Sequence, residues 1–219
     1  MGKTILTKRQ QQLLTLLFAD SYIKKHFYLT GGTALSEYYL HHRLSEDLDL
    51  FSSEEVDPKG VEIILKKIKK KINFKKIVYQ NHFNRNLFFL HFNDEILKTE
   101  FTYYPFEQIE KPNNMENIKI DSLFDIAVNK ADTIITNPRS RDFIDLYLII
   151  NLKKWQFNKL IKDARIKFDK YVDPLQITEQ LLQATKVKDY PRMIVPLENK
   201  KWQNFWLNEA RKLKDQIFK

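Results

Sequence analysis

The sequence predicts an α/β sheet domain followed by a helical domain. In the first half, segments with helical apolar spacing alternate with short runs rich in β-branched and aromatic residues. After a polar stretch at 105–117, which contains two prolines, only helical patterns follow. With 219 residues and 43% hydrophobic side chains, the chain can form one large or two small cores. We place an α/β domain at residues 1–117 and a helical domain at residues 118–219.

The first half supplies the predicted sheet. Thr7 can cap a helix whose leucines form a broad apolar face. A later helix starts at Pro58, a residue favoured in the first helical turn. Between the last two predicted strands, Asn93 and Asp94 suit a tight turn. The predicted helices cover residues 7–25, 33–42 and 58–71, and the predicted strands cover 27–29, 48–51, 74–80, 87–92 and 96–104.

The second half reads as a helical bundle. Asp121 or Ser122 can cap its first helix, and Asn137-Pro138 breaks the helical pattern. This break predicts a helical hairpin. The predicted helices cover residues 121–135, 140–152, 157–168, 174–187 and 198–217.

The composition narrows the classes of function. The sequence has no cysteine, which excludes a disulfide scaffold and cysteine-ligated zinc and fits a reducing cytoplasm. No apolar run approaches the roughly 20 residues of a membrane helix, so we expect a cytoplasmic protein without a membrane partner. The 37 basic against 28 acidic residues give a net charge of +9. This charge favours a polyanionic partner, although a generally lysine-rich composition explains it equally well.

Two of the four glycines in the chain are adjacent, at Gly31 and Gly32, and open a predicted helix. Glycine permits positive φ and lets a backbone approach a ligand closely. Free N–H groups at a helix start, with the Thr33 hydroxyl, can bind an anion such as phosphate. A tight strand-to-helix turn without a ligand is the alternative.

Asp47 and Asp49 stand two residues apart on a predicted strand. They therefore share one face, about 6.6 Å apart along the strand. This spacing suits shared or paired metal ions, and the linker is long enough to return the carboxylates to the glycine turn. Glu100, on another predicted strand, is the candidate third ligand for a two-metal site. A solvated strand face for the aspartates and an exposed edge position for Glu100 are the alternatives.

These residues match a known pattern. The run Gly31-Gly32-Thr33-Ala34-Leu35, then His42-Arg43-x-Ser45-x-Asp47-x-Asp49-Leu50-Phe51, resembles the AbiEii/AbiGii-type toxin nucleotidyltransferases of the polymerase-β-like superfamily. Lys130-Ala131-Asp132 and Arg139-x-Arg141-Asp142-x-x-Asp145-Leu146 resemble the second-half motifs of that family. The resemblance covers most of residues 25 to 206.

The resemblance implies a polymerase-β-like fold and a magnesium-dependent transfer of a nucleoside monophosphate from an NTP to an acceptor hydroxyl. The acceptor would be RNA, such as the 3′ end of tRNA, and an antitoxin from the same operon would be the protein partner. Asp47 and Asp49 would hold two Mg²⁺ ions, with Glu100 as the weakest assignment. Gly31, Gly32, Thr33, Arg43 and Ser45 would lie at the nucleotide, and Ser45 is a phosphorylation position in some relatives.

Lys130 would contact the nucleotide phosphates, with Asp145 as its acidic partner in the helical half, in a cleft between the two domains. The predicted hairpin brings Lys130 and Asp145 side by side, where a purely structural ion pair is an equal alternative. Two other functions stay open at this point: a non-catalytic nucleotide- or RNA-binding module, and a transferase acting on a small molecule or a protein.

Overall fold

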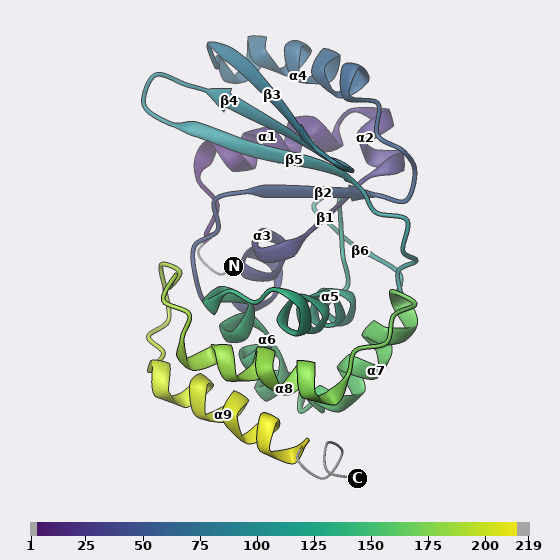
Figure 1. Cartoon of the computed structure of the whole chain (residues 1–219). Helices are drawn as coiled ribbons and strands as arrows, with labels where there is room; N and C mark the ends of the chain where they lie inside the picture. Colours follow the sequence, from purple (N-terminus) through teal and green to yellow (C-terminus); the bar gives the residue numbers. More distant parts are fainter. Residues whose placement is uncertain (1–3, 214–219) are drawn as a thin grey trace. The chain divides into compact units, whose positions relative to one another are not determined.

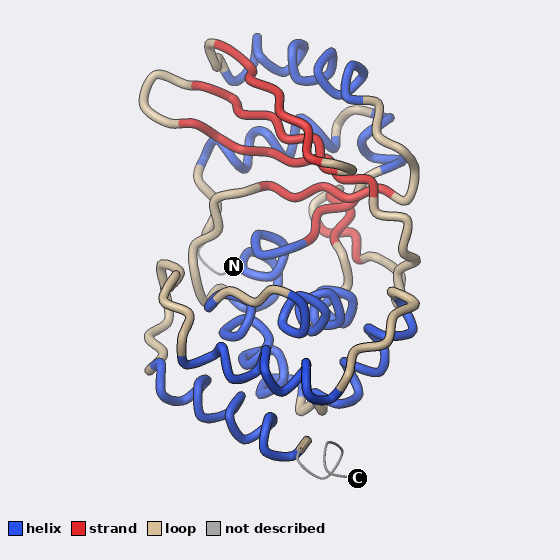
Figure 2. Tube along the Cα trace, viewed as in Figure 1, coloured by secondary structure: helices blue, strands red, loops and turns tan. Residues whose placement is uncertain are grey.

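A computed structural model describes residues 4–213. Its contacts divide the chain into two compact units, Met1–Ser122 and Leu123–Lys219. The first unit combines helices with a sheet, while the elements within residues 123–213 are helical (Figure 1, Figure 2). The predicted mixed α/β class is therefore confirmed. Within residues 4–213, no helix is both long enough and apolar enough to cross a bilayer.

Within residues 4–122, seven strands form one sheet in the order β3-β4-β5-β2-β1-β7-β6. Strand β2 lies inside the sheet, antiparallel to β1 and parallel to β5. The register places Thr30 beside Asp49 and Asp49 beside Glu100, and register partners point to the same face of a sheet. The strands are β1 (Tyr28–Thr30), β2 (Leu48–Ser52), β3 (Lys76–His82), β4 (Arg85–His91), β5 (Ile96–Tyr103), β6 (Asn113–Met115) and β7 (Ile118–Ile120).

Helices α1 (Lys8–Phe18) and α4 (Pro58–Ile72) cover one face of the sheet (Figure 1). Along β2, Leu48 and Leu50 are fully buried, and they alternate with the more exposed Asp49. This alternation directs the leucines to the core and the carboxylate to the opposite face. The opposite face, where the short helix α3 (Gly31–Leu35) begins, therefore carries the polar residues.

Two predicted helices of the first unit differ from the structure, and in the second unit the helix predicted at 174–187 ends at Leu182 and is followed by a 3₁₀-helix. The helix expected at residues 7–25 is divided into α1 and α2 (Ser21–His26), because the Asp20 carboxylate accepts hydrogen bonds from the backbone of Tyr22 and Ile23 and caps a new helix. The second predicted helix already starts at Gly31, rather than after a glycine turn, and continues as a π-helix at Ser36–Leu40.

Strands β6 and β7 lie where the sequence predicted a polar boundary and then only helices. Leu29 of β1 pairs with Ile120 of β7, so the sheet continues beyond residue 117. The prediction of helices alone after this stretch is wrong. Each of these strands has three residues, too few for a two-residue apolar period to be recognised in the sequence.

The second unit packs its described helices around aromatic side chains. Phe143 stacks on Trp202 with ring centroids 6.1 Å apart, and its carbonyl accepts a hydrogen bond from Trp206 Nε1 at 3.1 Å. The predicted end of the last helix, at residue 217, lies outside the described residues. The described helices are α5 (Leu123–Thr136), α6 (Ser140–Lys153), α7 (Phe157–Lys167), α8 (Pro174–Leu182), the 3₁₀-helix Gln183–Thr185 and α9 (Asn199–Lys212).

Candidate active site

Gly31 joins β1 to α3 and lies directly against Asp49. Its φ is +70°, a conformation that favours glycine. A Cβ atom at this position would lie 2.7 Å from Asp49 Oδ2, which is closer than van der Waals contact allows. Both the backbone conformation and the approach of the carboxylate therefore require glycine here. The predicted return of the Asp-x-Asp strand to the glycine pair is confirmed.

Gly32 and Thr33 hold the segment that precedes β2. A Cβ at Gly32 would lie 2.5 Å from Arg43 Nη2, so the buried guanidinium packs on the backbone of α3. Thr33 Oγ1 lies 2.8 Å from Ser45 Oγ and also donates a hydrogen bond to the carbonyl of Asp47. A hydroxyl has one proton, and Thr33 donates it to the carbonyl of Asp47. Thr33 is therefore a positioning residue for Asp47.

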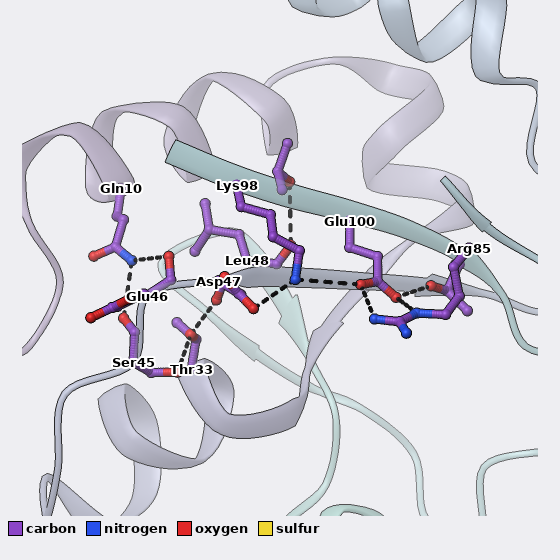
Figure 3. Close-up of polar contacts among 11 residues, drawn as sticks. Gln10, Thr33, Ser45, Glu46, Asp47, Leu48, Arg85, Lys98 and Glu100 are labelled. Atoms are coloured by element: carbon purple, nitrogen blue, oxygen red, sulfur yellow. Dashed lines mark hydrogen bonds and ion pairs between the residues drawn. The ribbon is translucent and has the colours of Figure 1, made fainter. Parts of the chain in front are cut away.

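Gln10 of α1 is a part of this arrangement that the sequence analysis missed. Its Nε2 donates hydrogen bonds to the carbonyls of Ser45 at 3.1 Å and Glu46 at 3.0 Å, and its side chain is buried (Figure 3). In the sequence, Gln10 stands at helical spacing from Leu13, Leu14 and Leu17, and this position on the apolar face was the available signal. Gln10 and Thr33 together fix the loop that presents Asp47.

Three carboxylates and two cations lie along the polar face, on β2, β4, β5 and the residue directly before β2. Figure 3 shows four of them: Asp47, Arg85, Lys98 and Glu100. Lys98 Nζ lies 2.7 Å from Asp47 Oδ2 and 3.9 Å from Glu100 Oε2. The cations Lys98 and Arg85 were not predicted. They balance part of the negative charge that Asp47, Asp49 and Glu100 bring together.

Glu100 is buried and engaged by two neighbours. Arg85 Nε and Nη2 donate to its two oxygens, both at 2.6 Å, and Thr102 Oγ1 donates at 2.7 Å. Burial alone raises the pKa of Glu100, but these hydrogen bonds lower it below the ordinary value. A bidentate Arg–carboxylate pair is among the strong charge-assisted contacts. Glu100 therefore anchors Arg85 in this structure.

Asp49 has the opposite environment. Among residues 4–213 its carboxylate accepts no hydrogen bond and forms no ion pair. Desolvation, followed by the charges of Glu100 and Asp47, raises the pKa of Asp49 to about 6. Within the same residues, no three His, Asp or Glu side chains converge closely enough to hold a metal ion. Asp49 is thus the carboxylate of this face whose negative charge is least compensated by cations of the protein.

In the second unit, Lys130 of α5 reaches two carboxylates of α6. Its Nζ lies 2.7 Å from Asp142 Oδ1 and 2.9 Å from Asp145 Oδ2, and all three side chains are largely buried. The hairpin around Pro138 brings Lys130 and Asp145 together, as its spacing predicted. Asp142, which the sequence analysis did not assign to the site, is the closer partner.

Comparisons with known proteins identify the family of this chain. The family model for "Nucleotidyl transferase AbiEii toxin, Type IV TA system" matches residues 12–213. An uncharacterized protein of Aquifex aeolicus (strain VF5), aq_aa25, is 33% identical over 164 residues, which are 74% of this chain and 76% of that protein.

Solved structures share the fold at low sequence identity. JHP933 from Helicobacter pylori superimposes with a TM-score of 0.60 at 18% identity, over 96% of this chain and 90% of that one. MenT4, a nucleotidyltransferase toxin from Mycobacterium tuberculosis H37Rv, gives a TM-score of 0.57 at 16% identity, over 94% and 82% of the two chains. Because the family model matches most of the length of this chain, the chain belongs to the AbiEii nucleotidyltransferase toxins of type IV toxin–antitoxin systems.

Proposed function

We propose that the protein transfers a nucleoside monophosphate from an NTP to a hydroxyl of an RNA acceptor, such as the 3′ end of tRNA, with Mg²⁺ held by Asp47 and Asp49. The contact of Asp49 with Gly31 carries this proposal. It joins a carboxylate that has no ion-pair or hydrogen-bond partner among residues 4–213 to the backbone at the start of α3. A metal-bound triphosphate needs both a cation site and backbone donors within reach of each other.

The residues at this place fit magnesium. Carboxylate oxygens are the ligands that Mg²⁺ prefers, and the raised pKa of Asp49 reflects its desolvation and the negative charges of Glu100 and Asp47 beside it. When bound, Mg²⁺ activates the acceptor hydroxyl and stabilises the departing pyrophosphate. Asp47 can offer the oxygen that Lys98 leaves open. Two ions, with Glu100 as a third ligand, remain a proposal that requires Arg85 to release the Glu100 carboxylate.

The residues around the carboxylates have separate proposed roles. Gly31 and Gly32 place the backbone of α3 at the phosphates, and Arg43 adds positive charge there. Thr33 and Ser45 keep Asp47 in position through their hydroxyl contact. Phosphorylation of Ser45 would introduce negative charge two residues from Asp47 and is a proposed point of control. In the second unit, Lys130 can contact a phosphate if it exchanges one carboxylate partner, with Asp145 retaining the other bond.

Net charge and family support the proposed partners. A charge of +9 favours an RNA acceptor, and membership of a type IV toxin–antitoxin family supports a cognate antitoxin. Nucleotides and tRNA are cytoplasmic molecules, so the proposal places the protein in the cytoplasm.

The function is tested with purified protein, Mg²⁺, bulk tRNA and each of the four α-labelled NTPs in turn. We expect label to enter tRNA with at least one NTP. Asp47→Asn and Asp49→Asn should each reduce this transfer by about 100-fold or more, because each removes a charge that holds the metal. Glu46→Gln is the matched control, since Glu46 is exposed and directly precedes Asp47. Label in protein or in a small molecule instead of RNA would refute the RNA acceptor.

Metal binding has a readout that does not depend on activity. A ligand that binds only the folded state raises the thermal midpoint. Mg²⁺ should therefore stabilise the wild type and the Glu46→Gln control, and it should have no effect on the Asp49→Asn variant. Equal stabilisation of all three proteins would argue against Asp49 as a metal ligand.

A further inference from the structure

The turn of the β3–β4 hairpin carries an aromatic side chain that is not packed into the fold. The strands pair as far as His82 and Arg85, which leaves Phe83 and Asn84 as a two-residue loop. Phe83 is 98% exposed and makes no ring contact within residues 4–213. Its φ is +54°, a conformation that two-residue hairpins of this kind normally give to glycine at the first loop position. Exposure of the ring and backbone strain both oppose folding.

The loop is nevertheless fixed in place. Asn84 Nδ2 donates to the carbonyl of Tyr103 at 2.6 Å, and the Tyr103 amide donates to the carbonyl of Asn84 at 3.0 Å. Asn81 Nδ2 donates to the carbonyl of Phe83 at 3.2 Å. The exposed ring is therefore attached to a loop that hydrogen bonds hold in one conformation. A ligand that contacts the ring meets a preorganised surface.

Arg85 follows at the base of the same loop and faces the acidic residues. Its side chain is 51% exposed, although Glu100 accepts two hydrogen bonds from it. Thr102 donates in turn to Glu100 and so fixes the carboxylate that holds Arg85. Its contacts within residues 4–213 use Nε and Nη2, so the other N–H donors of the guanidinium are available to a ligand. The Cα atoms of Phe83 and Arg85 lie within about 7 Å of each other, because residues two positions apart in a chain cannot be farther apart than that.

The hairpin lies on a defined side of the candidate metal ligand. Arg85 on β4 contacts Glu100 on β5, and Glu100 is the register neighbour of Asp49 on β2. Gly31 contacts Asp49 from the other side, at the end of β1. The strand order β4-β5-β2-β1 therefore separates the glycine backbone from the hairpin, with Asp49 between them.

We propose that the tip of the β3–β4 hairpin, residues 82–85, binds the single-stranded end of the acceptor RNA, with a base stacked on Phe83 and a phosphate on Arg85. This inference rests on the proposed nucleotidyl transfer and assigns its acceptor to the β4 side of Asp49, opposite the glycines. An exposed aromatic plane beside an anchored guanidinium matches the two parts of a nucleotide, its base and its phosphate. The base would cover the ring that the fold leaves exposed.

Binding is measured directly, by fluorescence anisotropy of a labelled single-stranded RNA of about 10 nucleotides, without NTP or metal. Phe83→Ala should weaken binding about 5- to 100-fold with an unchanged dependence on salt, because stacking releases no counterions. Arg85→Gln should weaken binding and also reduce the slope of log K against log salt by about 0.7, the value for one phosphate contact on a single strand.

Matched controls lie in the second unit. Tyr171 is 75% exposed, so Tyr171→Ala removes an exposed aromatic ring of similar size. Arg211→Gln removes the same charge as Arg85→Gln from an exposed position. Both controls should bind RNA as the wild type does. Equal losses in the controls and in the hairpin variants, or wild-type binding by Phe83→Ala, would overturn the proposal.

Phe83→Gly separates binding from folding. Glycine accepts the positive φ, so this variant should have a higher thermal midpoint than the wild type and still bind RNA more weakly. Phe83→Trp should retain binding. If Phe83→Gly keeps full RNA affinity, or if the probe binds only as a duplex, the proposal is wrong. Failure of the wild type to transfer any nucleotide would instead refute the proposed function, which this NTP-free assay does not use.

Discussion

Lys98 and Arg85 show how the side chains of the protein hold the acidic face together. Lys98 bridges Asp47 at 2.7 Å and Glu100 at 3.9 Å, while Arg85 engages Glu100 alone. Asp49 lies between these ion pairs and has no direct partner among residues 4–213. A cation that enters this face therefore gains most at Asp49, and the Asp47 oxygen that Lys98 does not engage offers a second contact.

Gly31→Ala tests the contact between the first glycine and Asp49. The new methyl group meets Asp49 Oδ2 at 2.7 Å, and alanine is strained at a φ of +70°. We expect a loss of about 1–3 kcal/mol in the free energy of unfolding, measured by urea denaturation. The displaced carboxylate should also lose the Mg²⁺-dependent rise in thermal midpoint.

Gly60→Ala is the matched control for this prediction. Gly60 lies in α4, and the nearest atom to its added Cβ is the end of the Asp57 side chain, at 2.8 Å. The Mg²⁺ response should survive in this variant. If Gly31→Ala also keeps the full response, the close approach of Gly31 to Asp49 does not matter for metal binding.

At the level of the elements, β2 was predictable and its neighbours were only partly so. The alternation of Leu48, Asp49 and Leu50 fixes which side chain leaves the core, and Gly31-Gly32 marks the start of the helix. The roles of Lys98 and Arg85 depend on how β5 and β4 align with β2, and strand register is set by long-range pairing. No spacing within one segment contains that information.

The α5–α6 hairpin shows the same limit and gives a prediction about pH. Burial raises the pKa of Asp142, but the charge of Lys130, 2.7 Å away, lowers it below the ordinary value of 3.8 overall. A lowered pKa in the folded state adds stability above the ordinary pKa, and this stability is lost as pH falls through the lowered value.

Asp142→Asn should therefore destabilise the protein by about 1–3 kcal/mol at pH 7, and by progressively less as the pH falls from about 4 to 3. Urea midpoints at both ends of this range check the prediction. Glu179→Gln, an exposed change of carboxylate to amide on α8, should have little effect at any pH. A cost for Asp142→Asn that stays constant with pH would contradict the role of the ion pair.

For the whole molecule, the net charge of +9 is spread over many exposed side chains, with its densest run on α4. The buried residues of α4, among them Val61, Leu65 and Ile68, face the core, and the lysines occupy its exposed side. Such a face is normally solvated, and its contribution to RNA binding is then a long-range field rather than a defined site.

This long-range electrostatic field is tested by removing the same number of positive charges from two places. One variant replaces four exposed lysines of α4 and the residues after it with glutamine: Lys67, Lys70, Lys71 and Lys75. The other replaces four exposed lysines of the second unit: Lys153, Lys162, Lys186 and Lys200.

At about 10 mM salt the Debye length is about 30 Å, so charges act over distances comparable to the molecule. Both variants should slow association with bulk tRNA by a similar factor at this salt, measured by stopped-flow fluorescence. The difference from the wild type should largely disappear at about 0.2 M salt, where the field is screened. Loss of tRNA association in the α4 variant alone would instead assign a specific RNA contact to that helix.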